Sequence, residues 1–228
     1  MATTGEAGYA EALRESPHFA TAPAGEPSWP QVAPLGAITL ATLPNERPGA
    51  LSAQEAAAFR QRLVALAEGF AAERDDSGYH IPFSTNRYVW GSNAEILNRA
   101  MVLANAYDLT QDARFRGAVI DAMDYLLGRN PLDQSYVSGY GERPMRNPHH
   151  RFWAPSYDTG LPGPPPGALS GGPNNSPPAD EVAQALYGKC APQACWADDA
   201  RAYSLNEVAI NWNAPLVWVA AFLDDTAD

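Results

Sequence analysis

The sequence predicts an all-α protein. No stretch alternates polar and apolar residues as a half-buried strand does, whereas several stretches repeat apolar residues at helical spacings. Two of these stretches begin with a Ser-x-x-Glu capping box, at Ser52 and at Ser92. The 228 residues can bury a sizeable core and fit one domain, so we expect helices of roughly 15–20 residues joined by long loops.

The N-terminal third is expected to hold one short and one long helix. The short helix covers Glu6–Glu15, and the proline-rich residues 17–51 are interpreted as a loop with one short helix in it. The capping box at Ser52 opens the long helix, which ends before Gly78. Four apolar residues share one face of this helix: Phe59, Leu63, Leu66 and Phe70.

Two more helices are expected in the middle of the chain. The capping box at Ser92 opens one of them, and Asp112 caps the other, which stops at Gly128. Apolar residues line one face of each helix: Ile96, Ala100, Leu103 and Tyr107 in the first, and Phe115, Val119, Ala122 and Leu126 in the second.

A long irregular tract separates these helices from the last one. Residues 129–200 are rich in Pro, Gly, Ser and Asn, and structureless loops of this length are functional or disordered. Cys190 and Cys195 lie in this tract and allow a disulfide, two free thiols or, least favoured, a zinc site, because no His lies nearby. The last helix lies within Leu205–Asp224, and Pro215 either kinks or restarts it.

Charge and hydropathy exclude some classes of function. A net charge of −11 and a pI near 4.7 argue against a nucleic-acid partner but suit a neutral polysaccharide. No apolar run reaches the roughly 18 residues that span a bilayer, so no membrane segment is expected. Residues 1–6 lack the basic and apolar regions of a signal peptide.

The stretch from Trp196 to Ala214 points to a chemistry. It reads W-A-D-D-A-R-A-Y-S-L-N-E-V-A-I-N-W-N-A and places Asp198 and Glu207 nine positions apart among aromatic and amide side chains. These are the groups that a sugar-cleaving site needs. A carboxylic acid protonates the glycosidic oxygen, rings stack on sugar faces, and amides bond the hydroxyls.

This stretch resembles the catalytic-acid motif of the family 9 glycoside hydrolases, which are mostly endo-acting cellulases. The motif positions occur without a gap: Trp196, Asp198, Tyr203, Glu207, Ala209, Asn213 and Ala214. Residues 135–151 resemble the family's second motif, a glycine-bearing loop that ends in His-x-Arg at His149 and Arg151. There the basic residue after the glycines is Arg143, preceded by Glu142, which departs from the expected order. Weaker similarities occur at 22–29, 89–93 and 128–137.

The resemblance implies an (α/α)6 barrel, in which six inner and six outer helices form a toroid with the cleft at one end. The few helices expected here match its C-terminal half, so residues 1–228 are interpreted as one partial catalytic domain. The family inverts configuration with an acid and a base, and its base lies in an Asp-x-Gly-Asp motif. That motif is absent from this sequence, so we expect the chain alone to be inactive or nearly so.

The resemblance assigns catalytic roles to Glu207, Asp198 and His149. Glu207 is expected to be the general acid, with its pKa raised by an apolar surround of Tyr203, Trp212 and Ile210; the alternative is a surface Glu in a helix's first turn. Asp198 bonds sugar hydroxyls or orients Glu207, or merely caps a loop. His149 bonds the hydroxyls of the sugar beside the cleaved bond, or belongs to a solvated basic turn.

Five residues are expected to bind substrate: Arg151, Trp90, Trp212, Tyr203 and His150. Arg151 bonds hydroxyls, whereas the motif leaves the position of His150 free. Trp90 and Trp212 are stacking platforms or ordinary core residues, and Tyr203 matches the motif but has a structural alternative.

The expected partner is cellulose, another β-glucan or cellooligosaccharides, acted on by a secreted and monomeric full-length enzyme. No cofactor is required. The resemblance allows a structural calcium ion, but no EF-hand-like spacing of acids assigns its ligands. The alternatives are a non-catalytic glucan-binding remnant, or a hydrolase of mixed-linkage glucan or glucosaminides with the same fold.

Overall fold

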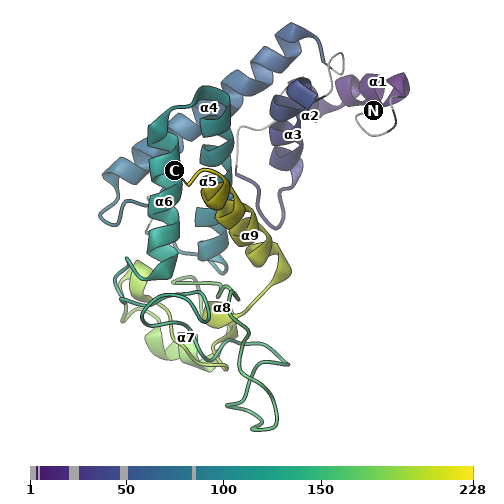
Figure 1. Cartoon of the computed structure of the whole chain (residues 1–228). Helices are drawn as coiled ribbons and strands as arrows, with labels where there is room; N and C mark the ends of the chain where they lie inside the picture. Colours follow the sequence, from purple (N-terminus) through teal and green to yellow (C-terminus); the bar gives the residue numbers. More distant parts are fainter. Residues whose placement is uncertain (1–3, 5, 21–25, 47–50, 84–85, 228) are drawn as a thin grey trace.

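A computed structural model describes residues 4, 6–20, 26–46, 51–83 and 86–227. Within these ranges the regular elements are helices, and β-pairing is limited to isolated bridges, which confirms the all-α class. The long helices stand together in the upper part of Figure 1, and the irregular tract lies across their lower ends. None of the described helices is both long and apolar enough to cross a membrane.

Four helices form the core: α4 (Ala53–Asp76), α5 (Ser92–Thr110), α6 (Ala113–Leu127) and α9 (Ile210–Asp225). The central helix is α5, which contacts the other three (Figure 1). Its side chains are buried around its whole circumference, including fully buried Ile96, Leu97 and Leu103. A helix surrounded in this way belongs to the inside of a fold rather than to its surface.

The caps predicted for α4 and α6 are confirmed. Ser52 Oγ accepts the Glu55 N–H, and the Glu55 carboxylate accepts the Ser52 N–H. Asp112 caps α6 by accepting the Arg114 N–H, and Gly128 ends it at φ 136°, where few residues other than glycine fit. The predicted apolar faces of both helices are buried, with Leu66 partly so.

The capping box predicted at Ser92 is wrong. The N-cap of α5 is Gly91, at φ 90°, and no side chain caps the helix. Ser92 is instead the first helical residue, and its hydroxyl donates to the Pro173 carbonyl at 2.7 Å. The Asn93 amide donates to the Ser170 carbonyl. The first turn of α5 thus binds a segment of the irregular tract, residues 170–173, rather than its own side chains.

The N-terminal region is more helical than the sequence predicts. After α1 (Ala7–Glu15), which confirms the first helix, come α2 (Pro17–Ala20) and the 14-residue α3 (Ala33–Glu46). The prediction of a loop with one short helix over 17–51 is therefore wrong. Pro34 is compatible with α3 because it lies in the first turn, where its missing N–H has no partner to lose.

The last helix is neither restarted nor shortened at Pro215. A short helix, α8 (Tyr203–Asn206), precedes Glu207, and α9 then runs from Ile210 through Pro215 to Asp225. The buried Pro215 lies in the second turn, where it removes one main-chain hydrogen bond.

The irregular tract is ordered, and it contains only α7 (Glu181–Leu186) and the 3-10 turn η1 (Pro192–Ala194) as described helices. Side-chain amides replace regular pairing, as when Asn130 donates to the Tyr125 and Gln134 carbonyls at 2.8 Å. Cys190 and Cys195 form a disulfide, which decides between the three alternatives that the sequence leaves open.

Glu95, in the first turn of α5, gives the fold a pH-dependent stability. Burial, assisted by the charge of Glu26 and opposed by Arg99, raises the pKa of Glu95 from 4.5 to about 7. The folded state then keeps this proton to higher pH than the unfolded state does. The contribution of Glu95 to stability therefore falls as pH rises from 4.5 to about 7 and is level above.

Glu95→Gln removes this titration. We expect the variant to equal the wild type in stability near pH 4 and to exceed it by about 1–3 kcal/mol at pH 8, measured by urea unfolding. Glu142→Gln, at an exposed position in the irregular tract, is the control and should leave the pH dependence unchanged. The same pH dependence in Glu95→Gln and wild type would contradict the assignment.

Candidate active site

Glu207 lies in an extended segment between α8 and α9, at the lower end of the core helices. Its main chain is held from two sides. The His149 N–H donates to the Asn206 carbonyl at 2.8 Å, and the Gly171 N–H donates to the Glu207 carbonyl at 2.9 Å. The two motifs found in the sequence therefore meet, with His149 and Glu207 paired in an isolated β-bridge.

Asp198 connects these motifs through its carboxylate. Its two oxygens accept the main-chain N–H groups of Arg146 at 2.9 Å and Asn147 at 2.7 Å. The Asn206 side chain donates to the same carboxylate at 3.3 Å. These bonds make Asp198 a cap of the 146–147 loop and, through Asn206, connect it to the residue before Glu207.

One ring bonds the Glu207 carboxyl group, and two further rings follow from it. The Trp90 indole N–H donates to Glu207 Oε2 at 3.1 Å, and the centroids of Trp90 and Tyr203 are 5.7 Å apart. The His149 ring follows at 5.6 Å from Tyr203. Its Nδ1 lies 2.7 Å from the Ala200 carbonyl, which can only accept, so Nδ1 holds a proton and Nε2 is left for a ligand.

The residues near the Glu207 carboxyl group differ from those that the sequence predicts. Ile210 is 90% exposed and does not cover the carboxyl group, and Trp90 is the ring that contacts it. Trp212 is 9% exposed and packs on two glycines, Gly91 and Gly171, where an added Cβ would come within 2.8 and 2.9 Å of its ring. This burial favours the core role of Trp212 over the stacking role.

His150 and Arg151 follow His149 at the edge of the cluster. Arg151 is exposed. The His150 ring stacks on Trp153 with centroids 3.9 Å apart, and burial and then the charge of His149 lower its pKa. The structure thus gives His150 a packing partner and leaves the Arg151 side chain facing solvent.

Two residues that the sequence interpretation missed hold the acid-bearing segment. Asn206 is fully buried, and its amide donates to the Asn147 carbonyl at 2.7 Å as well as to Asp198. Asp180 accepts the Ser204 N–H and hydroxyl on one oxygen and the Ala183 N–H on the other. The position of Asn206 directly before Glu207 was the available signal, whereas nothing in the sequence marked Asp180.

Comparison with known proteins agrees with this geometry. The family model described as glycosyl hydrolase family 9 matches residues 1–220. Endoglucanase C of Cellulomonas fimi is 42% identical over 229 residues, which cover 98% of this chain and 20% of that protein. The chain belongs to glycosyl hydrolase family 9.

A second relative, cellulose 1,4-beta-cellobiosidase of Acetivibrio thermocellus, is 39% identical over 98% of this chain and 27% of its own length. The chain therefore spans about a quarter or less of these two relatives. Among solved structures, an endoglucanase of Alicyclobacillus acidocaldarius matches with a TM-score of 0.81 at 34% identity, over 98% of this chain and 41% of that one.

The family 9 endoglucanase J30 matches with a TM-score of 0.85 at 28% identity, over 96% of this chain and 40% of that one. These two matches confirm the predicted toroid fold for the part of it that this chain covers. The helices and the irregular tract superpose on the (α/α)6 toroids of family 9 over about 40% of their chains.

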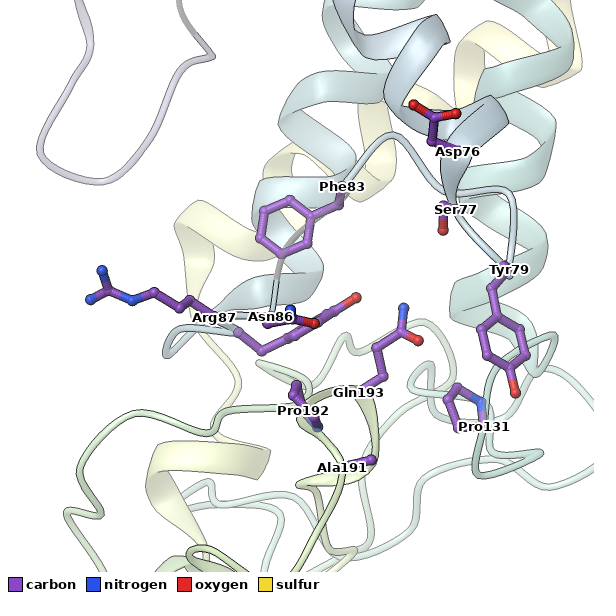
Figure 2. A pocket seen from close by; sticks show the side chains of 12 residues that line it. Asp76, Ser77, Tyr79, Phe83, Asn86, Arg87, Pro131, Ala191, Pro192 and Gln193 are labelled. Atoms are coloured by element: carbon purple, nitrogen blue, oxygen red, sulfur yellow. The ribbon is translucent and has the colours of Figure 1, made fainter.

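A separate pocket of about 790 Å³ lies where the end of α4 meets the disulfide-closed loop (Figure 2). Asp76 and Tyr79 line it from the α4 side, Phe83 from the following connection, and Gln193 projects between them from the loop. None of the predicted site residues is among the described residues that line it.

The described residues include no group of three or more His, Cys, Asp or Glu side chains placed to hold a metal ion. The calcium ion that the family allows thus has no such ligand set in the described ranges, and we assign no step to it.

Asp198→Asn tests the connection between the motifs. The variant loses the charge that the two main-chain N–H groups bond, so we expect a stability loss of about 1–3 kcal/mol. We also expect amide hydrogen exchange at Arg146 and Asn147 to accelerate by about tenfold or more.

Asp199→Asn is the matched control, because the Asp199 carboxylate bonds the Arg201 side chain at 2.5 Å and the Arg201 N–H at 2.9 Å rather than the N–H groups of the 146–147 loop. Unchanged exchange at Arg146 and Asn147 in Asp198→Asn would refute the role given to Asp198.

Proposed function

We propose that the protein to which this chain belongs hydrolyses internal β-1,4-glucosidic bonds of cellulose or a related β-glucan. Glu207 is the general acid, and the reaction proceeds with inversion. The observation that supports this most is the bond from the Trp90 indole to Glu207 Oε2, within a cluster formed by both family motifs. That bond fixes one oxygen, and no described residue bonds Oε1, which is free to protonate a substrate oxygen.

In the proposed reaction, Glu207 gives its proton to the glycosidic oxygen as the bond from that oxygen to the anomeric carbon breaks. The bonding electron pair leaves with the oxygen. A water molecule attacks the anomeric carbon from the opposite face and loses a proton to a base. The sequence contains no Asp-x-Gly-Asp motif, so we place the base in a part of the longer protein outside these residues.

The remaining cluster residues bind and orient the sugar. His149, held by the Ala200 carbonyl, presents Nε2 to a hydroxyl of the sugar beside the cleaved bond. Arg151 and His150 bond hydroxyls further out. Trp90, 42% exposed, and Tyr203 offer ring faces for stacking on a pyranose.

The substrate class is supported by relatives. One structure, 34% identical to this chain with a TM-score of 0.79, is AaCel9A in complex with a cellobiose-like isofagomine. Export of the complete enzyme is supported by the Cys190–Cys195 disulfide, since disulfides persist in oxidising compartments. We propose that the complete enzyme is a monomer that needs no cofactor and binds neither nucleic acid nor membrane.

The test compares the isolated chain with a chimera. The purified 228-residue chain should release no reducing sugar from carboxymethyl cellulose, because it lacks the base. Fusion behind the catalytic-domain segment that precedes the matched region of Cellulomonas fimi endoglucanase C should restore release. Glu207→Gln in the chimera should lower kcat by at least about 100-fold, as expected for loss of a general acid.

Asp225→Asn is the control, at an exposed position at the end of α9, and should retain the activity of the chimera. Full activity in the Glu207→Gln chimera would show that Glu207 is not the acid. Hydrolysis by the isolated chain would show that a carboxylate within residues 1–228 serves as base.

A further inference from the structure

Residues 170–175 of the irregular tract hold the main chain around Glu207. The Gly171 N–H donates to the Glu207 carbonyl at 2.9 Å. The buried Asn174 side chain donates to the Ser204 carbonyl, three residues before the acid, at 2.9 Å. These bonds fix the place of the acid-bearing segment relative to residues 170–175.

The same segment also holds the main chain on both sides of Trp90. After Trp90, the Ser92 hydroxyl donates to the Pro173 carbonyl at 2.7 Å. Before Trp90, residues 86–88 are bonded to Asn175. The ring that bonds the acid is therefore carried on a short span whose two ends are attached to one segment.

Asn175 makes three hydrogen bonds to this span. Its side-chain Oδ1 accepts the Tyr88 N–H at 2.8 Å, and its Nδ2 donates to the Asn86 carbonyl at 2.9 Å. Its main-chain N–H donates to the Tyr88 carbonyl at 3.0 Å. A side-chain amide offers an acceptor and a donor together, so it supplies the pairing that a neighbouring strand would otherwise give.

Tyr88 connects these bonds to the core. Its side chain is 1% exposed and packs edge to face on Phe83, with ring centroids 5.3 Å apart. Burial, opposed by a hydrogen bond from Gln193, raises the pKa of Tyr88 to about 12. Since Tyr88 lies two residues before Trp90, a shift of its main chain is passed on to the indole.

We propose that Asn175 is a positioning residue for the general acid, and that it acts by holding the Trp90 indole N–H at Glu207 Oε2. This proposal rests on the proposed function, because it takes Glu207 as the acid. The adjacent Asn174 bonds the acid-bearing segment while Asn175 bonds the ring-bearing one, so two neighbouring residues set the 3.1 Å bond between ring and acid. Without that bond, Glu207 is free to turn its proton away from the substrate oxygen.

The first test follows the Trp90 indole N–H by NMR in the 228-residue chain. Its signal is the one that Trp90→Phe lacks, and Glu207→Ala gives its position without the bond. We expect Asn175→Ala to move the signal most of the way to that position, since two of the three Asn175 bonds are lost. The Trp196 indole, which donates to Ser170 Oγ at 2.9 Å, should keep its signal.

Asn86→Ala is the matched control, because the exposed Asn86 bonds Asn175 through its carbonyl, which alanine also has. This variant should leave the Trp90 signal in place. Asn175→Asp is a milder change, which keeps an acceptor for the Tyr88 N–H but has no N–H for the Asn86 carbonyl. Its Trp90 signal should lie between those of the wild type and Asn175→Ala, and it decides in the same way if Asn175→Ala does not fold.

The second test measures hydrolysis of carboxymethyl cellulose by the chimera. Asn175→Ala should lower kcat by about 10- to 100-fold, because a small displacement of a catalytic group can cost about 100-fold. Asp225→Asn, at an exposed position, is again the control and should retain full activity.

The outcomes separate this proposal from the proposed function. An unmoved Trp90 signal in Asn175→Ala overturns the positioning role, and so does a Trp196 signal that moves with it, since Asn175 would then support the fold in general. Full kcat in Asn175→Ala, in a chimera that Glu207→Gln inactivates, overturns the positioning role and leaves the proposed function intact. Full activity in the Glu207→Gln chimera refutes the proposed function, and this proposal with it.

Discussion

The irregular tract must pair its own buried main-chain groups without strands, and the position of the site depends on how it does so. Buried N–H and C=O groups are costly unless they are bonded. Main-chain bonds across the loops supply part of this pairing, and side-chain carboxylates and amides supply another part: Asp198 takes two N–H groups, the Asn213 side chain takes that of Leu169, and Asn174 donates to the Ser204 carbonyl. Each of these bonds joins one particular side chain to one particular main-chain group, and together they hold the loops in one arrangement around Glu207.

Sequence patterns predict best where the structure depends on local contacts. The caps at Ser52 and Asp112 involve residues two or three positions away, and both are present. At Ser92 the same pattern fails because the hydroxyl bonds Pro173, 81 positions away, and no local rule contains that contact. The high proline count of residues 17–51 predicts a loop, but Pro34 occupies the first turn of α3, where a proline is compatible with a helix.

In the candidate site, too, sequence patterns predict some features and miss those that depend on long-range packing. Motif spacing predicts that Asp198, Glu207 and His149 belong together, and the structure places them in one cluster. The sequence cannot separate Trp90 from Trp212, because either ring could stack on a sugar or pack in the core. Only the packing shows that one ring bonds the acid while the other fills the space above Gly91 and Gly171. The proposed reaction needs an acid and a base. This chain contains the motif of the acid, but it contains no Asp-x-Gly-Asp motif for the base.

Asp198 binds the loop through main-chain N–H groups rather than through side chains, and this has a consequence for substitutions. The side chains at 146 and 147 take no part in these two bonds, so replacing either side chain leaves both donors in place. Proline is the exception, because it has no N–H to donate. The chain places its proline one position later, at Pro148, where no bond to Asp198 is lost.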